Sequence, residues 1–343
     1  MAHSITDAAR QTWPPFVLVA GLLAIGAVLE ADQVFAALGA RIERASARTG
    51  TLLAALLGLD AVVTALLNLD TAVVFVTPIA LHAAAWRRCD LRPFLYGSLF
   101  IANGASLLLP GSNLTNLIVL AHEHLTGAGM AQTMALPWLA VTVSTTAYVG
   151  LVFRPDAGDR KEEPPPPLRI GVGALAATAA TVLILVLRNP AIPVLAIGLT
   201  AAALRRIRPR FDAHVLAALV LLAVALGTLA RRWHWPASIV ASAGGVGDAI
   251  LGAASSVVVN NLPAASLLAA RRPAHPLPLL VGLNLGPNLF WTGSLSAYLW
   301  YRAARTAGLR PSVKTSTLLA LGLVPLTIAV ALAALALVKP SAL

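Results

Sequence analysis

The sequence predicts an all-α polytopic membrane protein built as an inverted-topology repeat, with two re-entrant hairpins and two broken transmembrane helices. Three observations support this fold class. The chain is 58% hydrophobic and only 11% charged, whereas soluble proteins carry about 25% charged residues. Its basic residues fall in short loops between apolar segments. Polar residues and helix breakers interrupt the apolar sequence in two matching pairs of places.

A membrane span needs about 20 apolar residues. The apolar segments cover residues 14–36, 51–85, 93–121, 132–153, 169–187, 190–204, 211–230, 238–270, 277–301 and 314–338. Two of them, 51–85 and 238–270, are too long for one span and are polar near the middle. Each is either a pair of spans or a hairpin that returns to its own side. The central Asn residues favour the hairpin, because a loop at membrane depth needs polar groups around its backbone.

The basic residues divide unequally between the two sides of this topology. Of the 25 Lys and Arg residues, 18 fall on one side and seven on the other. The richer side is expected to be cytoplasmic, which places both termini outside a multi-pass protein of the plasma membrane. The net charge of +11 therefore reflects membrane orientation, and we expect no nucleic-acid partner.

The order of the elements predicts two oppositely oriented halves. Residues 1–153 form a first repeat of span, hairpin, broken span and span, and residues 211–343 repeat this series in the inverted orientation. A Pro-rich cytoplasmic linker, 154–168, and an extra helix pair within 169–210 join them. Inverted repeats of this kind place a substrate site near the membrane midplane, between the halves.

The interruptions supply the candidate substrate-binding side chains. Pro and Gly break a helix, and a half-helix that starts at such a break directs its positive end and free N–H groups into the site. Amide and hydroxyl groups gather at the two breaks and at the two hairpin centres. The candidate substrate-binding residues are Asn68, Ser112, Asn113, Thr115, Asn116, Asn260, Asn261, Asn284, Asn288, Thr292 and Ser294.

Asp70 is the carboxylate closest to a hairpin tip, and an acid at membrane depth is a candidate proton carrier. Asp60 and Asp248 lie farther from the tips and are expected to have structural roles. No Arg or Lys falls within the predicted site segments. The deep segments contain neither a His–carboxylate pair nor a cysteine, so we expect no enzyme activity, no cofactor and no metal site.

Four segments give the chain a resemblance to the arsenite permease family of the ion transporter superfamily. The superfamily also includes sodium-coupled carboxylate carriers and some sodium/proton antiporters. The segments are Asp70-Thr71-Ala72 through Thr77-Pro78-Ile79, Ser112-Asn113-Leu114-Thr115-Asn116, Asn260-Asn261-Leu262-Pro263, and Asn284-Leu285-Gly286-Pro287-Asn288 with Gly293-Ser294-Leu295 and Leu299-Trp300.

The resemblance implies a secondary active transporter that exports arsenite or antimonite hydroxide in exchange for protons and so confers arsenic resistance. It also implies that the protein works in the inner membrane, as a homodimer or with a bound ATPase subunit. The alternative is a sodium- or proton-coupled carrier of carboxylates or inorganic anions from the same superfamily. Some family members have an acid and a base where this chain has Asn284 and Asn288, so proton coupling would depend more on Asp70.

Overall fold

The computed structural model consists of helices joined by short turns, and its described parts are residues 2–123, 125–154, 171–208, 213–233, 238–240, 242–339 and 341. No strand occurs in these ranges. Several helices are long and apolar enough to cross a membrane, namely Ile5–Ala31, Thr49–Leu66, Leu69–Trp86, Gly127–Phe153 and Val313–Val338. The prediction of an all-α polytopic membrane protein is confirmed.

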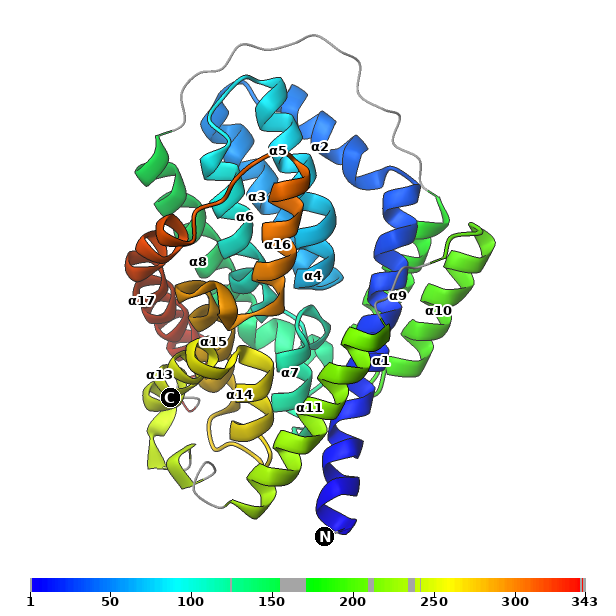
Figure 1. Cartoon of the computed structure of the whole chain (residues 1–343), viewed down its shortest axis with the longest axis vertical. Helices are drawn as coiled ribbons and strands as arrows, with labels where there is room; N and C mark the ends of the chain where they lie inside the picture. Colours follow the sequence, from blue (N-terminus) through cyan, green and yellow to red (C-terminus); the bar gives the residue numbers. More distant parts are fainter. Residues whose placement is uncertain are drawn as a thin grey trace.

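The first helix is longer than the predicted span 14–36. Helix α1 covers Ala2–Ala31 and continues through Pro14 and Pro15. It ends before Gln33, whose φ of 56° lies in the left-handed region and turns the chain. A second helix that the sequence analysis missed, α2 (Val34–Ala45), then crosses the upper end of the molecule (Figure 1).

The segment 51–85 forms a hairpin whose two arms return to the same end. Helix α3 (Thr49–Leu66) descends to the middle of the molecule, and the chain turns at Leu67 and Asn68. The return arm consists of α4 (Leu69–Thr71), the π-helical turn η1 (Ala72–Val76) and α5 (Thr77–Trp86). Its tip, at α4, lies about halfway along the long axis (Figure 1).

The segment 238–270 forms the matching hairpin from the opposite end. Helix α13 (Gly244–Val259) rises from the lower end and α14 (Asn261–Leu268) returns to it (Figure 1). The turn residue Asn260 has a φ of 76°, in the left-handed region that Asn tolerates better than most residues. The two hairpins therefore approach the centre of the molecule from opposite ends.

Each broken helix lies beside a hairpin and crosses the centre in two pieces. The first runs downward as α6 (Arg92–Gly104), the short turns η2 (Ala105–Leu107) and η3 (Pro110–Ser112), and α7 (Leu114–Val119). The second runs upward as α15 (Pro276–Leu285), η5 (Gly286–Leu289), η6 (Trp291–Gly293) and α16 (Leu295–Thr306). Both breaks occur at the predicted Pro and Gly residues.

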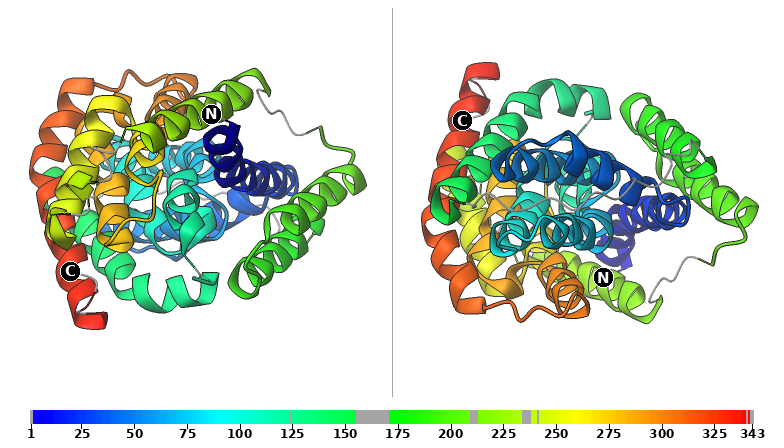
Figure 2. Two further views of the ribbon diagram at one scale, coloured as in Figure 1. Left: turned by 90° about the horizontal axis from the view of Figure 1, so that it is seen from below. Right: turned by 90° about the horizontal axis from the view of Figure 1, so that it is seen from above.

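The remaining helices surround this centre. They are α8 (Gly127–Phe153), α9 (Val172–Val186), α10 (Ala191–Leu204), α11 (Ala213–Arg232) and α17 (Val313–Val338). Figure 2 shows the α9–α10 pair on one side of the molecule, beside α1, and α17 on the opposite side, beside α8. Apart from Arg154, the predicted linker 154–168 lies outside the described residues.

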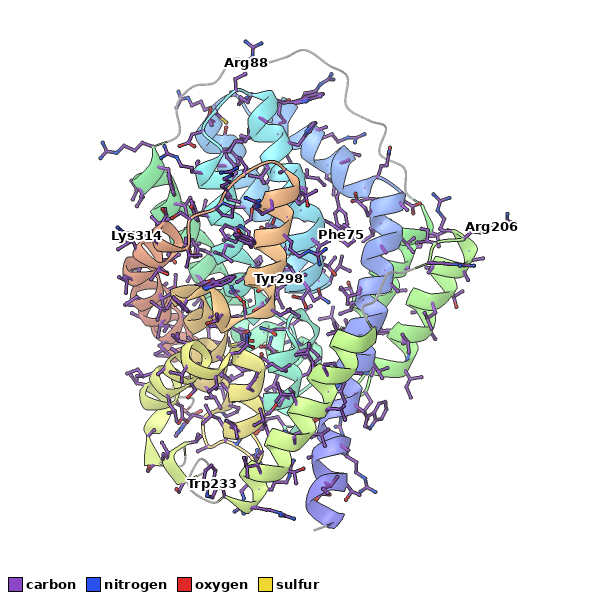
Figure 3. All side chains as sticks on the ribbon, viewed as in Figure 1. Phe75, Arg88, Arg206, Trp233, Tyr298 and Lys314 are labelled. Atoms are coloured by element: carbon purple, nitrogen blue, oxygen red, sulfur yellow. The ribbon has the colours of Figure 1, made fainter. Side chains whose placement is uncertain are left out.

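The two ends of the molecule differ in the labelled residues that they carry. Arg88 and Lys314 lie in the upper part of Figure 3, as does Arg206, whereas Trp233 lies at the lower end. These three basic residues are among the 18 that the charge pattern assigns to the cytoplasmic side.

Candidate functional site

A cavity of about 320 Å³ lies where the two hairpin tips and the two helix breaks meet. Its polar lining comes from all four of these elements, and α11 contributes apolar side chains. The lining residues are Leu69, Asp70, Asn113, Leu114, Thr115, Leu219, Leu222, Val259, Asn260, Asn261, Leu262, Pro263, Ser294, Leu295 and Ser296. Small-molecule sites usually have volumes of about 300–1,000 Å³, so the cavity suits a small solute.

In the first half, Asn side chains cap the helices that begin at the cavity. The Asn68 Oδ1 atom accepts a hydrogen bond from the backbone N–H of Thr71 at 2.7 Å. The Asn113 Oδ1 atom likewise accepts one from the N–H of Thr115 at 3.1 Å. A cap satisfies only part of the four N–H groups that a helix start leaves unpaired, so further donors remain at each tip.

The second half uses the same device. The Asn260 Oδ1 atom accepts a hydrogen bond from the N–H of Leu262 at 3.3 Å, while its Nδ2 atom donates to the carbonyl of Thr292 at 2.8 Å. This second bond joins the hairpin tip to the helix break. Ser294 precedes α16, and its hydroxyl lies 2.7 Å from that of Ser296.

A buried amide network beside the cavity connects the two broken helices. The Asn284 Nδ2 atom donates to Asn116 Oδ1 at 2.7 Å, and Asn284 Oδ1 accepts from Asn113 Nδ2 at 2.5 Å and from Ser106 Oγ at 3.0 Å. Asn284, Asn116 and Ser106 are fully buried. Buried polar groups of this kind need their partners, so the network fixes the position of each break against the other.

A second contact extends the network towards α6. The Asn103 Nδ2 atom donates to Asn288 Oδ1 at 2.8 Å, and Ser296 Oγ donates to Asn103 Oδ1 at 3.4 Å. Ser112 instead joins the first break to the first hairpin, because its hydroxyl donates to the carbonyl of Ala65 at 2.9 Å. Ser112 and Asn260 thus each join a helix break to a hairpin.

The cavity combines one acidic side chain with the positive N-terminal ends of several helices. Asp70 is its only carboxylate, and neither Arg nor Lys occurs among its described lining residues. Positive potential comes instead from the N-terminal ends of helices, where unpaired N–H groups favour an anion. Because an ionised Asp70 would repel an anionic solute, the site can hold both only if a proton or another cation accompanies them.

The structure divides the predicted site residues into three groups. Asp70, Asn113, Thr115, Asn260, Asn261 and Ser294 line the cavity. Asn68, Ser112, Asn116, Asn284 and Asn288 position these elements without appearing in the lining. Thr292 is exposed and does not appear in the lining, and its backbone carbonyl accepts the hydrogen bond from Asn260.

Two hydroxyl residues were missed by the sequence analysis. Ser106 donates to Asn284, and Ser296 lines the cavity. The second follows Ser294 by two residues, and a search for every polar residue within one turn of each break would have found both.

The comparison with known protein families matches almost the whole chain. The family described as citrate transporter (CitMHS) matches residues 4–333. The chain belongs to the citrate transporter family. Comparison with curated proteins finds no matching relative. Membership in this family makes the chain a secondary transporter and a multi-pass membrane protein.

The family assignment refines the earlier expectations. It supports the superfamily part of the resemblance and the expectation of a transporter rather than an enzyme. It does not support the arsenite permease branch or arsenic resistance, and it favours the carboxylate alternative. An anionic solute with an accompanying ion also agrees with a cavity that places Asp70 beside several helix N-termini.

Proposed function

We propose that this protein is a proton-coupled carrier of citrate-type carboxylates. The observation that carries the proposal is the combination of an isolated carboxylate, Asp70, with several helix N-termini around one cavity. Helix ends and amides bind the substrate carboxylates. Asp70 binds a proton, and the neutral side chain then no longer repels an anionic substrate beside it.

The sign of coupling follows from like-charge repulsion. A bound carboxylate raises the proton affinity of Asp70, and a protonated Asp70 raises the affinity for the carboxylate. Substrate and proton therefore favour the same loaded state and move in the same direction. Exchange of a neutral arsenite hydroxide for a proton has no such mutual stabilisation, which is a second reason to prefer the carboxylate reading.

The two halves supply the movement in this proposal. We treat residues 1–153 and 211–343 as inverted repeats whose hairpins and broken helices expose the cavity to each side in turn. The end that carries Arg88 and Lys314 is the cytoplasmic one, because basic residues collect on that side of a membrane protein. Both termini are then external. The α9–α10 pair, packed on α1, belongs to the stationary part.

Uptake by proteoliposomes tests the proposal. Purified protein is reconstituted, and labelled citrate uptake is measured under an inward proton gradient, an inward sodium gradient, or neither. We expect accumulation with the proton gradient alone. If accumulation required the sodium gradient, sodium rather than the proton would be the coupling ion. Arsenite uptake without citrate uptake would reject the proposal. The Thr178→Ala variant, whose side chain is exposed on α9 and does not line the cavity, serves as the unchanged control.

A further inference from the structure

Asp60 is a buried acid that the site described above does not use. It lies on α3 in the first hairpin, and the residue is only 1% exposed. Neither of its carboxylate oxygens has a hydrogen-bond partner in the part of the chain that the structure describes. Its neighbours along α3, Leu56, Leu57 and Ala61, are fully buried apolar residues. An ionised carboxylate is strongly disfavoured in such surroundings.

The second hairpin offers a direct comparison. Asp248 lies on the corresponding entering helix, α13, and is also fully buried. One of its carboxylate oxygens, Oδ2, is 3.2 Å from the Nδ1 atom of His275. Asp248 thus has a titratable partner at the start of α15, whereas Asp60 has no partner among the described residues. Burial in a hairpin therefore does not by itself leave an acid without a partner.

Three more unpaired polar atoms lie between Asp60 and the end of α4, in the part of the hairpin that reaches the cavity. Thr64 lies one turn farther along α3, on the same face, and its hydroxyl has no partner among the described residues. The Asn68 Nδ2 atom at the tip and the Thr71 hydroxyl just beyond it are likewise buried and unpaired. Leu69 and Asp70, between these two residues, line the cavity.

Buried polar side chains nearly always have hydrogen-bond partners in native proteins. Four such residues within the first hairpin, two on α3 and two at its tip, are therefore not explained by packing. Threonine hydroxyls can both donate and accept a proton, and an amide donates. These groups thus have the composition of a path along which a proton is passed through intervening water, because they form no hydrogen bond with one another.

The charged and titratable groups on the elements packed against α3 lie elsewhere or have other partners. Tyr96 and Tyr148 donate to backbone carbonyls, and Arg92 pairs with Asp90 at 2.8 Å. The full set on α2, α4, α5, α6 and α8, within the described residues, is Arg41, Glu43, Arg44, Asp70, His82, Arg92, Tyr96 and Tyr148. None of them forms a hydrogen bond or ion pair with Asp60.

We propose that Asp60 is a second proton-binding group, which exchanges its proton with the substrate cavity through Thr64, Asn68 and Thr71. A proton neutralises the acid without further ligands. A metal cation would need a shell of oxygen ligands, and the Thr64 hydroxyl is not within hydrogen-bond distance of the carboxylate. The coupling role of Asp60 rests on the proposed proton-linked function, and it predicts one proton more per cycle than Asp70 alone provides.

Infrared difference spectroscopy tests the protonation itself, without any substrate. The carbonyl stretch of a neutral carboxyl group is compared in reconstituted wild-type protein and Asp60→Asn at neutral pH. We expect the variant to lose one buried carboxyl band that the wild-type protein shows at neutral pH. Asp90→Asn, which removes an ion-paired carboxylate near the surface, should leave the band unchanged. An unchanged band in Asp60→Asn would overturn the proposal.

Transport measurements test the coupling. The number of protons carried per citrate is obtained from the membrane potential that stops net flux at a fixed pH gradient. We expect Asp60→Asn to carry one proton fewer than the wild type, and Thr64→Val to slow proton exchange while keeping the wild-type ratio. An unchanged ratio in a folded Asp60→Asn protein would contradict the proposal.

A second variant and a sodium control distinguish the remaining outcomes. If Asp60→Asn does not fold, Asp60→Glu keeps the acid, and the predicted result is a shifted but retained carboxyl band. A band that appears only after sodium is removed would show a cation site and overturn the proton assignment. If citrate is not carried at all, the proposed function fails, while the infrared result still decides whether Asp60 holds a proton.

Discussion

The Nδ2 atom of Asn113, in the first broken helix, donates a hydrogen bond of 2.5 Å to the Oδ1 atom of Asn284 in the second. The two residues are 171 positions apart in the chain, yet each lies at the break of its own helix. Asn113 also lines the cavity and caps α7. A single amide pair thus connects the two halves of the protein directly beside the proposed substrate.

The Asn284→Ala variant should be destabilised and inactive. It leaves Asn113, Asn116 and Ser106 without their shared partner, and each buried polar group left unpaired costs about 1–3 kcal/mol. Thermal unfolding in detergent should show a lower melting temperature than wild type. A melting temperature equal to that of the Thr178→Ala control would mean that the amide network does not hold the halves together.

The Asp70→Asn variant should bind citrate but respond less to the proton gradient than the wild type. The amide keeps the shape of the side chain and removes its charge, so citrate no longer needs a proton beside it. Citrate binding should therefore become nearly independent of pH, whereas wild-type binding weakens as the pH rises and Asp70 ionises. Binding measured across a pH series checks this, and an unaltered pH profile in the variant would remove Asp70 from the coupling role.

The Gly282→Ala variant should disrupt the packing of the second hairpin. A Cβ atom at this position would collide with the backbone of Ala249, so α13 and α15 could no longer lie as close together. Overpacking typically costs about 1–3 kcal/mol. Gly150→Ala is the matched control, because no atom lies within 4 Å of its added Cβ. The melting temperature of Gly282→Ala should lie below that of Gly150→Ala, and its size-exclusion profile should differ.

The Glu43→Gln variant should loosen the outer end of the first hairpin. Glu43 on α2 pairs with Arg87 at 3.5 Å, and Arg87 also donates to the carbonyl of Ser46 at 2.6 Å. Both charged side chains are buried, and removing one partner of a buried pair costs about 3–5 kcal/mol. Asp90→Asn breaks the exposed pair with Arg92 and should leave the melting temperature unchanged. Equal effects of the two substitutions would contradict this account.

Much of the fold follows from patterns that the sequence displays directly. Apolar length predicted the membrane helices, and Asn68 and Asn260 marked the hairpin tips because few residues other than Asn serve at once as cap and turn residues. The Pro and Gly residues marked both breaks. Each of these signals is local, so it can be identified without knowledge of the neighbouring elements.

The remaining features depend on packing between distant segments. Helix α2 was missed because its moderate polarity resembles a loop, although Phe35, Ala37 and Gly39 bury one face. The division between lining and supporting amides could not be predicted, because Asn113 and Asn116 differ only in their orientation on one helix turn. Asp60 had no local sign of importance, since its lack of a partner exists only in the folded hairpin.

A structure of the reconstituted protein with citrate bound tests the central claim most directly. We predict citrate density in the central cavity, with its carboxylates against Asn113, Asn260 and Asn261 and close to Asp70. A larger outer cavity, lined by Arg10, Arg188 and Arg231, is the competing location for an anion. Citrate bound there, with the central cavity empty, would contradict the account.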